Sequence, residues 1–532
     1  MSTFNPALTS AFKPAWTPVW GLSAITDAIK ALFVSGQQGV WYDPSDFSTL
    51  FQDAAGTTPV TAVEQPVGLM LDKRLGLVRG AEVAVNGTFD TDSAWTKAAN
   101  WTISGGAANS NGGTGFLQAV TSPLVVGKVY EATMLVTSFV SGQVSYPYSG
   151  SGVSYVAAAG VHRWVFTAAA TTLYVHSAAF SGSIDNVSVR ELPGNHATQA
   201  TAASRPVVSA RVNLLTSSED FSNAVWAKVL GVTTTGPNTL NFPNVTSGER
   251  FEFNTSTVAV ANTAVTFGLE LSGTGTINIA ANTTTGVGGN SEITVTLTAV
   301  PTRYLVTVTY NAAPTGNPRV FIIWRTGNTA TQVTANRAQF ELGTTATRYQ
   351  RVNTATDYDT AGFPMYDRLD GVDDSMTSAT GGGGTAGFFW CGAVKVTGAA
   401  GVTRVVFDDR GANSGYLLRI DSSGIVAFFA GNGTVLTNVS TAGAVVIGTT
   451  ALITAWDDGT NLNVQLDRGA VATIARPVVA AGTAGFTLGK VNGVAADFFS
   501  GNFYSSVYRQ GSGLTAAERA QVQAYVRSKA GL

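Results

Sequence analysis

The sequence predicts an all-β protein built from several β-sandwich domains, one of which is interrupted by two others. Short apolar runs, such as residues 130–140 and 388–396, recur at spacings of about 8 to 15 residues between clusters of Gly, Ser, Asn and Thr, which is typical of sandwiches. Two long blocks of the chain resemble each other. Three stretches outside these blocks, residues 39–74, 194–207 and 366–376, read as parts of one domain. A chain of 532 residues has room for about three or four domains.

The two similar blocks are predicted to be jelly rolls, which are β-sandwiches of about eight strands. The first block places Trp95 a short polar turn after Phe89, and the second places Trp226 in the same way after Phe221. A lysine follows two residues after each tryptophan. Because the tryptophans recur at equivalent positions in a strand-like opening, we expect both to lie in the cores of their blocks.

The predicted domain boundaries follow from this organisation. The chain divides into an N-terminal arm at residues 1–36, an interrupted domain at residues 37–76, 193–210 and 360–532, a first jelly roll at residues 77–192, and a second at residues 211–352. An exposed loop accepts a whole inserted domain when the termini of that domain lie close together. We therefore expect both jelly rolls to project from the interrupted domain as separate lobes.

Two helices complete the predicted fold. The arm has a proline-rich lead with Trp16 and Trp20, followed by helical spacing of apolar residues up to Phe33. This arm either packs on its own first domain or docks onto another protein. Near the C-terminus, Thr515 and Glu518 form the pattern of a capping box, and a glycine stands where the helix is expected to stop.

The composition excludes several classes of partner. Only 12% of the residues are charged and the formal net charge is -2, so there is no electrostatic reason to expect nucleic acid or an anionic membrane as a partner. The arm has no basic start and no apolar run long enough to span a bilayer, so we expect synthesis in the cytoplasm and no membrane insertion. The single cysteine, Cys391, stands in an apolar run and is expected to be an inert core thiol.

At the block openings and endings the sequence resembles a known family. The Phe-turn-Trp-Lys openings and the endings IDNVSVREL and AQFELG resemble carbohydrate-binding jelly-roll modules of tailed-phage structural proteins. The segments GVWYDPSD, GNHATQATAASRPV and DGVDDSM resemble a phage form of the laminin-G/concanavalin A-like lectin domain, although in that family they run almost continuously. The resemblance covers almost the whole chain outside the arm.

The resemblance implies a virion protein that is assembled in the host cytoplasm. A tail fibre, spike or head fibre of this kind would bind host-surface glycans, contact other virion proteins through its arm, and form a homotrimer. The alternative is a decoration or minor structural protein of the virion whose jelly rolls make protein-protein contacts only. Exposed aromatic clusters would favour the adhesive function, whereas apolar surface covered by neighbouring subunits would favour decoration.

Sugar binding uses aromatic faces against C–H surfaces and short polar side chains against hydroxyl groups. In the first block, the stretch around Tyr146 and Tyr148 is loop-like and therefore hard to bury. The candidate sugar-binding residues of both blocks are Trp101, Tyr146, Tyr148, Tyr155, His176, Trp324 and Arg325.

Calcium is the one cofactor that the sequence raises. Four aspartates, which form two acidic turns after apolar runs, are candidate ligands: Asp408, Asp409, Asp457 and Asp458. Ordinary hairpin turns also use Asp-Gly sequences, so the alternative interpretation is that these aspartates stabilise turns and bind no metal. For the aspartates of residues 370–374, which lack EF-hand spacing, we expect turn bonding.

We expect no enzymatic activity. Glycoside hydrolysis ordinarily needs two carboxylates that flank the bond. The chain has no glutamate between Glu341 and Glu518, which excludes the paired glutamates of glucanases from the C-terminal part. Glu249 and Glu252 stand three apart in a strand-like segment and are expected to face opposite sides. The three histidines stand without a Ser or Cys nucleophile motif.

Overall fold

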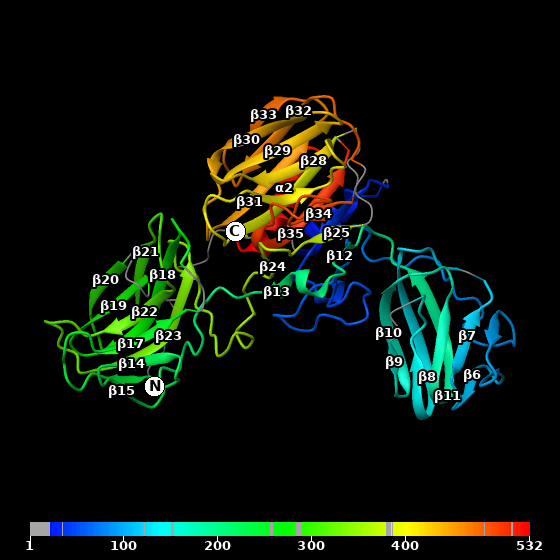
Figure 1. Cartoon of the computed structure of the whole chain (residues 1–532), viewed down its shortest axis with the longest axis horizontal. Helices are drawn as coiled ribbons and strands as arrows, with labels where there is room; N and C mark the ends of the chain where they lie inside the picture. The colour runs from blue at the N-terminus through cyan, green and yellow to red at the C-terminus, as the bar shows by residue number, and fades with distance from the viewer. Residues whose placement is uncertain are drawn as a thin grey trace, which may run out of the picture.

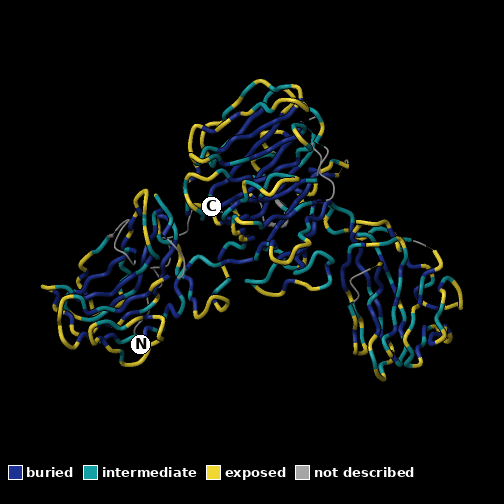
Figure 2. Tube along the Cα trace, viewed as in Figure 1, coloured by how far each residue is buried: buried dark blue, intermediate teal, exposed yellow. Residues whose placement is uncertain are grey.

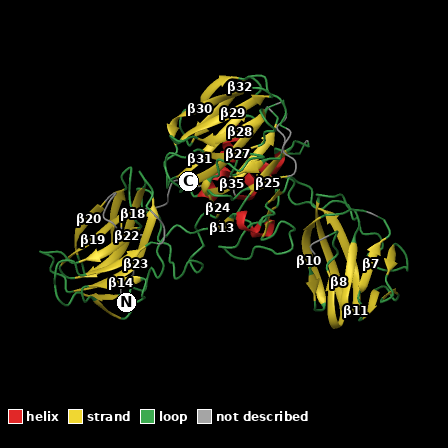
Figure 3. Ribbon diagram, in the orientation of Figure 1, coloured by secondary structure: helices red, strands yellow, loops and turns green. Residues whose placement is uncertain are grey.

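The computed structural model describes residues 22–34, 36–121, 123–150, 154–255, 259–283, 290–378, 385, 387–482, 485–511 and 514–532. Strands dominate, and the chain forms three β-rich lobes (Figures 1 and 3). Buried segments run through the interior of each lobe (Figure 2). No helix in these residues is long and apolar enough to cross a membrane. The predicted all-β, multi-sandwich fold class is confirmed.

The interrupted domain consists of two antiparallel sheets. Sheet A contains β13 (Val207–Ser209), β24 (Tyr366–Asp370), β35 (Ser500–Gln510), β26 (Phe388–Val396), β31 (Thr450–Asp457), β32 (Asn461–Leu466) and β33 (Ala472–Ala475) in that order, with β1 (Gly39–Tyr42) paired to β35. Sheet B contains β2 (Leu50–Phe51), β3 (Leu69–Met70), β12 (Ala197–Thr198), β25 (Met376–Ser378), β34 (Thr487–Leu488), β27 (Arg404–Asp408), β28 (Ser414–Ile420), β29 (Ile425–Asn432) and β30 (Leu436–Ala444) in that order. Two short 3-10 helices, η1 (Phe47–Thr49) and η2 (Ala202–Ser204), lie in the connections.

Segments from three distant parts of the chain share these two sheets. Gly39 in β1 pairs with Arg509 in β35. Strand β12 lies between β3 and β25, and β13 pairs with β24. The inner faces of both sheets meet in one aromatic core that includes Phe388, Phe407 and Tyr508. This core explains why the separated segments remain together, since each contributes apolar side chains to it.

Two helices cover part of the outer face of sheet A. They are α1 (Leu22–Ala31) and α2 (Ala516–Ala530). Thr515 caps α2 in a capping box with Glu518, and Gly531 ends it with a left-handed φ of 71°, as the sequence predicts. Phe33 is buried with Phe389 against α2 and sheet A, so the described part of the arm packs on its own domain. Trp16 and Trp20 lie outside the described residues.

The first jelly roll is one sheet that folds around its core. Its strands are β4 (Trp95–Lys97), β5 (Trp101–Ile103), β6 (Ala108–Asn111), β7 (Gly115–Ala119), β8 (Val129–Ser145), β9 (Tyr155–Val156), β10 (Gly160–Thr167) and β11 (Tyr174–Glu191). The long strands β8 and β11 pair along most of their length, with several register shifts. At one of these, a Cβ on Gly142 would lie 1.9 Å from the Ala179 carbonyl oxygen, so this bulge requires glycine.

The second jelly roll consists of two separate sheets around a common core. The first contains β14 (Trp226–Val229), β17 (Arg250–Asn254), β22 (Pro318–Ile323), β19 (Thr276–Thr283) and β20 (Asn290–Thr296) in that order. The second contains β15 (Thr233–Thr235), β16 (Thr239–Asn241), β23 (Gln332–Leu342), β18 (Ala264–Gly273) and β21 (Thr302–Thr309) in that order.

The recurring tryptophans have the same role in both jelly rolls. The indole N–H of Trp95 donates to the carbonyl oxygen of Asn86 at 3.1 Å, nine residues earlier. The indole N–H of Trp226 donates to the carbonyl oxygen of Ser217, also at 3.1 Å and nine residues earlier. Both rings are buried. The predicted core role of this pair is therefore confirmed, and the tryptophan closes the opening turn of each block.

Candidate functional site

Aromatic side chains gather on the outer face of the first jelly roll, where β7 pairs with the start of β11. Phe116 lies opposite His176 in this register, and Gln118 lies opposite Tyr174. The alternate residues Leu117 and Val175 are buried in the core. Because successive side chains of a strand point to opposite faces, Phe116, Tyr174 and His176 share the outer face.

Five residues form a continuous group, which we call the aromatic ledge: Phe116, Tyr148, Tyr155, Tyr174 and His176. The ring centroids of Phe116 and His176 are 4.6 Å apart, and those of Phe116 and Tyr174 are 5.7 Å apart. Tyr148 lies 5.8 Å from Tyr174 at the other end. The Tyr155 hydroxyl is hydrogen-bonded to Nδ1 of His176 at 2.9 Å. Neighbouring rings therefore hold each other in place.

The ledge is the most exposed aromatic surface of the described chain. Phe116 is 46% exposed and Tyr155 is 38% exposed, Tyr174 and His176 are half-buried, and Tyr148, at 8%, is buried at the end of the group. Every other strongly exposed large apolar side chain in the described residues is a valine, leucine or isoleucine. Exposed aromatic rings in one group mark a surface that contacts a ligand or partner, because leaving them in water is unfavourable.

Polar groups stand directly beside the rings. Thr96 lies opposite Gln118 in the pairing of β4 with β7, which places both beside Tyr174 in one cross-strand row. Within the described residues, no hydrogen bond engages the Gln118 amide or the Thr96 hydroxyl. Burial lowers the pKa of His176, so the imidazole is neutral at neutral pH. The ledge thus offers uncharged rings flanked by uncharged donors and acceptors.

The structure brings together three of the predicted sugar-binding residues, Tyr148, Tyr155 and His176, and separates the others from them. Tyr146 packs on Trp164 with a centroid distance of 4.1 Å, at the edge of the core. Trp101 is only 2% exposed, and its indole N–H donates to the Gly115 carbonyl at 3.2 Å. Because Trp101 is buried in the core, its ring faces are not available to a sugar.

The two candidates in the second jelly roll serve internal contacts. The Trp324 indole is buried and donates to the Ala330 carbonyl at 3.1 Å. Arg325 makes a bidentate pair with Glu292, with both nitrogen-oxygen distances 2.7 Å. The residues that sequence reasoning missed are Phe116, Tyr174 and Gln118. Burial alternates along residues 115–119, but the apolar and polar letters of GFLQA do not, so no local sequence pattern indicates these three residues.

The four predicted calcium ligands are used within the fold. Asp408 makes a bidentate pair with Arg410, at 2.8 and 2.9 Å. Asp457 accepts from Arg476 and from the Tyr416 hydroxyl at 2.7 Å. Asp458 accepts from backbone N–H groups of its own turn.

Asp409 has a different environment from the other three aspartates. Its carboxyl is fully buried and accepts from the Tyr416 N–H at 2.6 Å. Burial raises the pKa of Asp409 to about 8, so this carboxyl is protonated at neutral pH. A carboxyl group that binds calcium must be ionised. Internal partners and, for Asp409, a retained proton account for the four carboxyl groups within the fold.

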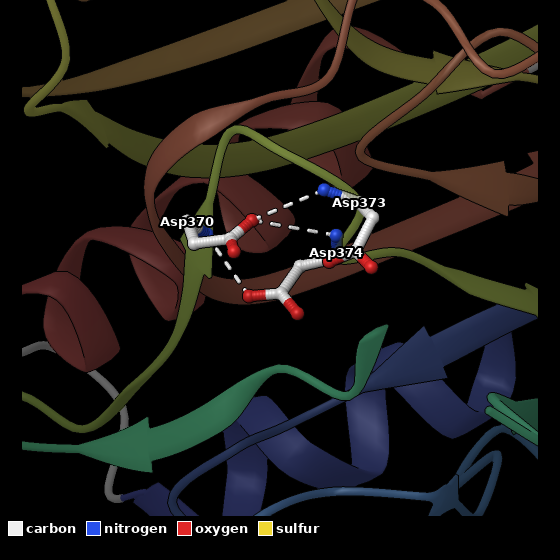
Figure 4. Close-up of side chains that lie close together, drawn as sticks. All are labelled: Asp370, Asp373 and Asp374. Carbon is white, nitrogen blue, oxygen red and sulfur yellow. Dashed lines mark hydrogen bonds between the residues drawn. The ribbon is translucent and has the colours of Figure 1, made fainter. Parts of the chain in front are cut away.

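A different group of carboxylates lies in the turn after β24 (Figure 4). Within the described residues, Asp370, Asp373 and Asp374 have carboxylate oxygens within 4.8 Å of one another. Oδ1 of Asp370 accepts from the backbone N–H groups of both other aspartates, at 3.3 and 3.4 Å. Oδ2 of Asp374 accepts from the Asp370 N–H at 2.9 Å. Burial and the neighbouring carboxylates raise the pKa of Asp374 to about 6. These hydrogen bonds from side chain to backbone within residues 370–374 are the turn bonding that the sequence predicts.

No protein-family model and no curated protein matches the sequence. Among solved structures, the binding domain of botulinum neurotoxin DC in complex with rat synaptotagmin II is similar at 10% identity and a TM-score of 0.25 over 32% of this chain and 44% of that chain. This chain therefore matches less than half the length of that domain.

Two further solved structures are matched over nearly their whole length. Mouse laminin alpha1 domains LG4-5 are similar at 9% identity and a TM-score of 0.21, over 55% of this chain and 98% of theirs. The tandem CBM22 domains of Paenibacillus barcinonensis Xyn10C are similar at 10% identity and a TM-score of 0.22, over 50% of this chain and 98% of theirs. At these identities and TM-scores, the similarities carry no argument about what this chain does.

Proposed function

We propose that this protein is a non-enzymatic, glycan-binding appendage of a tailed-phage virion, and that the aromatic ledge of the first jelly roll is its sugar-binding surface. The observation that carries the glycan-binding proposal is the group of exposed rings. Phe116 and Tyr155 flank His176 on an outer sheet face, and unpaired polar groups stand beside them. The assignment to a virion rests on the sequence resemblance.

The chemistry of the ledge fits a neutral sugar ring. The faces of Phe116 and Tyr174 offer flat apolar surface to C–H groups, and the Gln118 amide and Thr96 hydroxyl offer hydrogen bonds to hydroxyl groups. The five residues of the ledge include no carboxylate, so they do not supply the acid pair that glycoside hydrolysis needs. A shallow site of this kind binds weakly, and several copies in one particle raise the overall affinity.

A glycan array with purified protein tests the proposal. We expect binding by the wild type and loss of binding in the double variant Phe116→Ala, Tyr155→Ala, because both exposed ring faces disappear. Val161→Ala is the matched control, since Val161 is 75% exposed on β10 of the same jelly roll, outside the ledge. Binding that survives in the double variant would place the sugar elsewhere. Wild-type protein that binds no glycan in its multimeric form would favour the alternative, a virion decoration with protein contacts only.

The trimer is a separate part of the proposal and has its own measurement. Light scattering coupled to size-exclusion chromatography should give three times the chain mass of 55.0 kDa, which is 165 kDa. A mass of 55 kDa at micromolar concentration would contradict a trimer held by this chain alone. It would leave glycan binding by the ledge to be judged by the array.

A further inference from the structure

A cavity of about 420 Å³ lies where the second jelly roll meets the interrupted domain. We call it the junction pocket. The interrupted domain contributes Arg368 from β24, Lys395 from β26 and Asn502 from β35. The second jelly roll contributes Tyr310, which follows β21, and apolar residues that include Val265 and Leu342. Its volume falls in the range of small-molecule pockets, about 300–1,000 Å³.

The polar wall of the pocket is one row across three neighbouring strands of sheet A. Arg368 pairs with Asn502, and Asn502 pairs with Lys395. Val394 and Val396 point into the core between the sheets, so Lys395 points to the outer face. Further along the same face, Phe389 and Cys391 are covered by the helices. The outer face of β26 therefore carries apolar side chains where the helices pack on it. It carries the lysine where the second jelly roll lies against it.

Two polar groups of the pocket make no hydrogen bond in the described chain. The Tyr310 hydroxyl is buried and makes no hydrogen bond there. The Lys395 ammonium forms no hydrogen bond or ion pair with the described residues, whereas Arg368 is already paired to Glu64 at 3.0 Å. Burial lowers the pKa of Lys395, and the charge of the nearby Glu341 carboxylate opposes this shift. A bound anion would supply an acceptor to the Tyr310 hydroxyl, which is buried without one, and a directly hydrogen-bonded counter-charge to the half-buried Lys395 ammonium.

We propose that the junction pocket binds a small carboxylate with a compact apolar body. The carboxylate would accept hydrogen bonds from Lys395 and Tyr310, and the body would lie against Val265 and Leu342. A carboxylate suits this pair because charge-assisted hydrogen bonds are about twice as strong as neutral ones. An apolar body suits the opposite wall, which belongs to the core-facing side of the second jelly roll.

Isothermal titration calorimetry on the full chain tests the proposal with benzoate as the probe. Benzamide has the same shape without the charge, and glucuronate has the charge on a hydroxylated body. We expect benzoate to bind at millimolar concentration and the other two to bind at least about tenfold more weakly. Lys395→Met should weaken benzoate binding by about tenfold or more, and Tyr310→Phe should weaken it by a smaller factor.

The controls separate this site from the ledge and from misfolding. Lys490→Met removes a lysine of the interrupted domain outside the pocket and should bind benzoate like the wild type. Phe116→Ala should also leave benzoate binding unchanged. The proposal is overturned if benzoate does not bind, if benzamide binds equally well, or if folded Lys395→Met and Tyr310→Phe both keep wild-type affinity. If glucuronate binds and benzoate does not, the proposal that the ligand has an apolar body is wrong.

Discussion

The Asp72 carboxylate accepts a hydrogen bond from the backbone N–H of Asn195 at 2.9 Å, although 123 residues separate the two. The same carboxylate accepts from the Trp41 N–H at 2.9 Å and from Nε of Arg74 at 2.8 Å. Asp72 is fully buried. One side chain therefore joins the first segment of the interrupted domain to the segment that follows the first jelly roll.

Replacing Asp72 should destabilise the interrupted domain strongly. We expect Asp72→Ala to lower its free energy of unfolding by about 3–5 kcal/mol, because the Arg74 guanidinium and three backbone N–H groups lose a buried partner. Urea denaturation followed by tryptophan fluorescence measures this. Asp92→Ala removes an aspartate that is 55% exposed and paired to Lys97, and should cost less than about 1 kcal/mol. Equal effects of the two substitutions would contradict the role of Asp72.

Removing the tryptophan of the second repeat should affect that lobe alone. Trp226→Ala should lower the free energy of unfolding of the second jelly roll by about 3–5 kcal/mol, the range for a large buried aromatic ring. The first jelly roll has its own core around Trp95 and should be unaffected. Hydrogen exchange measured by mass spectrometry resolves the lobes separately. Faster exchange in residues of β8 and β11 would show that the jelly rolls are coupled.

Stability should fall as the pH rises through the neutral range. An unfolded aspartate loses its proton near pH 4, whereas folded Asp409 keeps it up to about pH 8. The folded state therefore binds the extra proton between these values, so its stability decreases from about pH 4 to about pH 8. Asp409→Asn should flatten this decline in thermal melts recorded across that range. A variant that declines as steeply as the wild type would exclude Asp409 as the source.

The histidine of the ledge should titrate below its ordinary range. Burial lowers the pKa of His176, so its imidazole should show a midpoint below about 6.5 in an NMR titration of the ring protons. The chain has only three histidines, and His176→Gln identifies the signal by its loss. A midpoint above 6.5 would mean that the imidazole carries a charge near neutral pH, which would contradict the neutral ledge described above.

Some features of this molecule can be predicted from residues that lie close together in the sequence. The capping box at Thr515 and the two core tryptophans follow from short-range signals, since the residues that determine them lie within ten positions in the sequence. Arg410 lies two residues after Asp408 and could have indicated the ion pair that occupies this predicted calcium ligand.

The ledge and the junction pocket depend on pairings between distant strands. Phe116 meets His176 only because β7 pairs with β11 in one particular register, and a shift of one residue would turn these side chains inward. The polar row of the pocket joins Asn502 to Lys395 and to Arg368. Both partners lie more than a hundred residues before Asn502 in the sequence. No local periodicity contains that information.

The pairing of Gly39 with Arg509 has a consequence for the synthesis of the protein. The ribosome must add 470 further residues before β1 meets its partner strand, which takes roughly 25 to 95 s at about 5–20 residues per second. Both jelly rolls are continuous stretches of chain and are complete long before then. During synthesis, therefore, both jelly rolls can fold while the apolar segment around Trp41 has no partner strand. That segment remains accessible to chaperones until β35 leaves the ribosome.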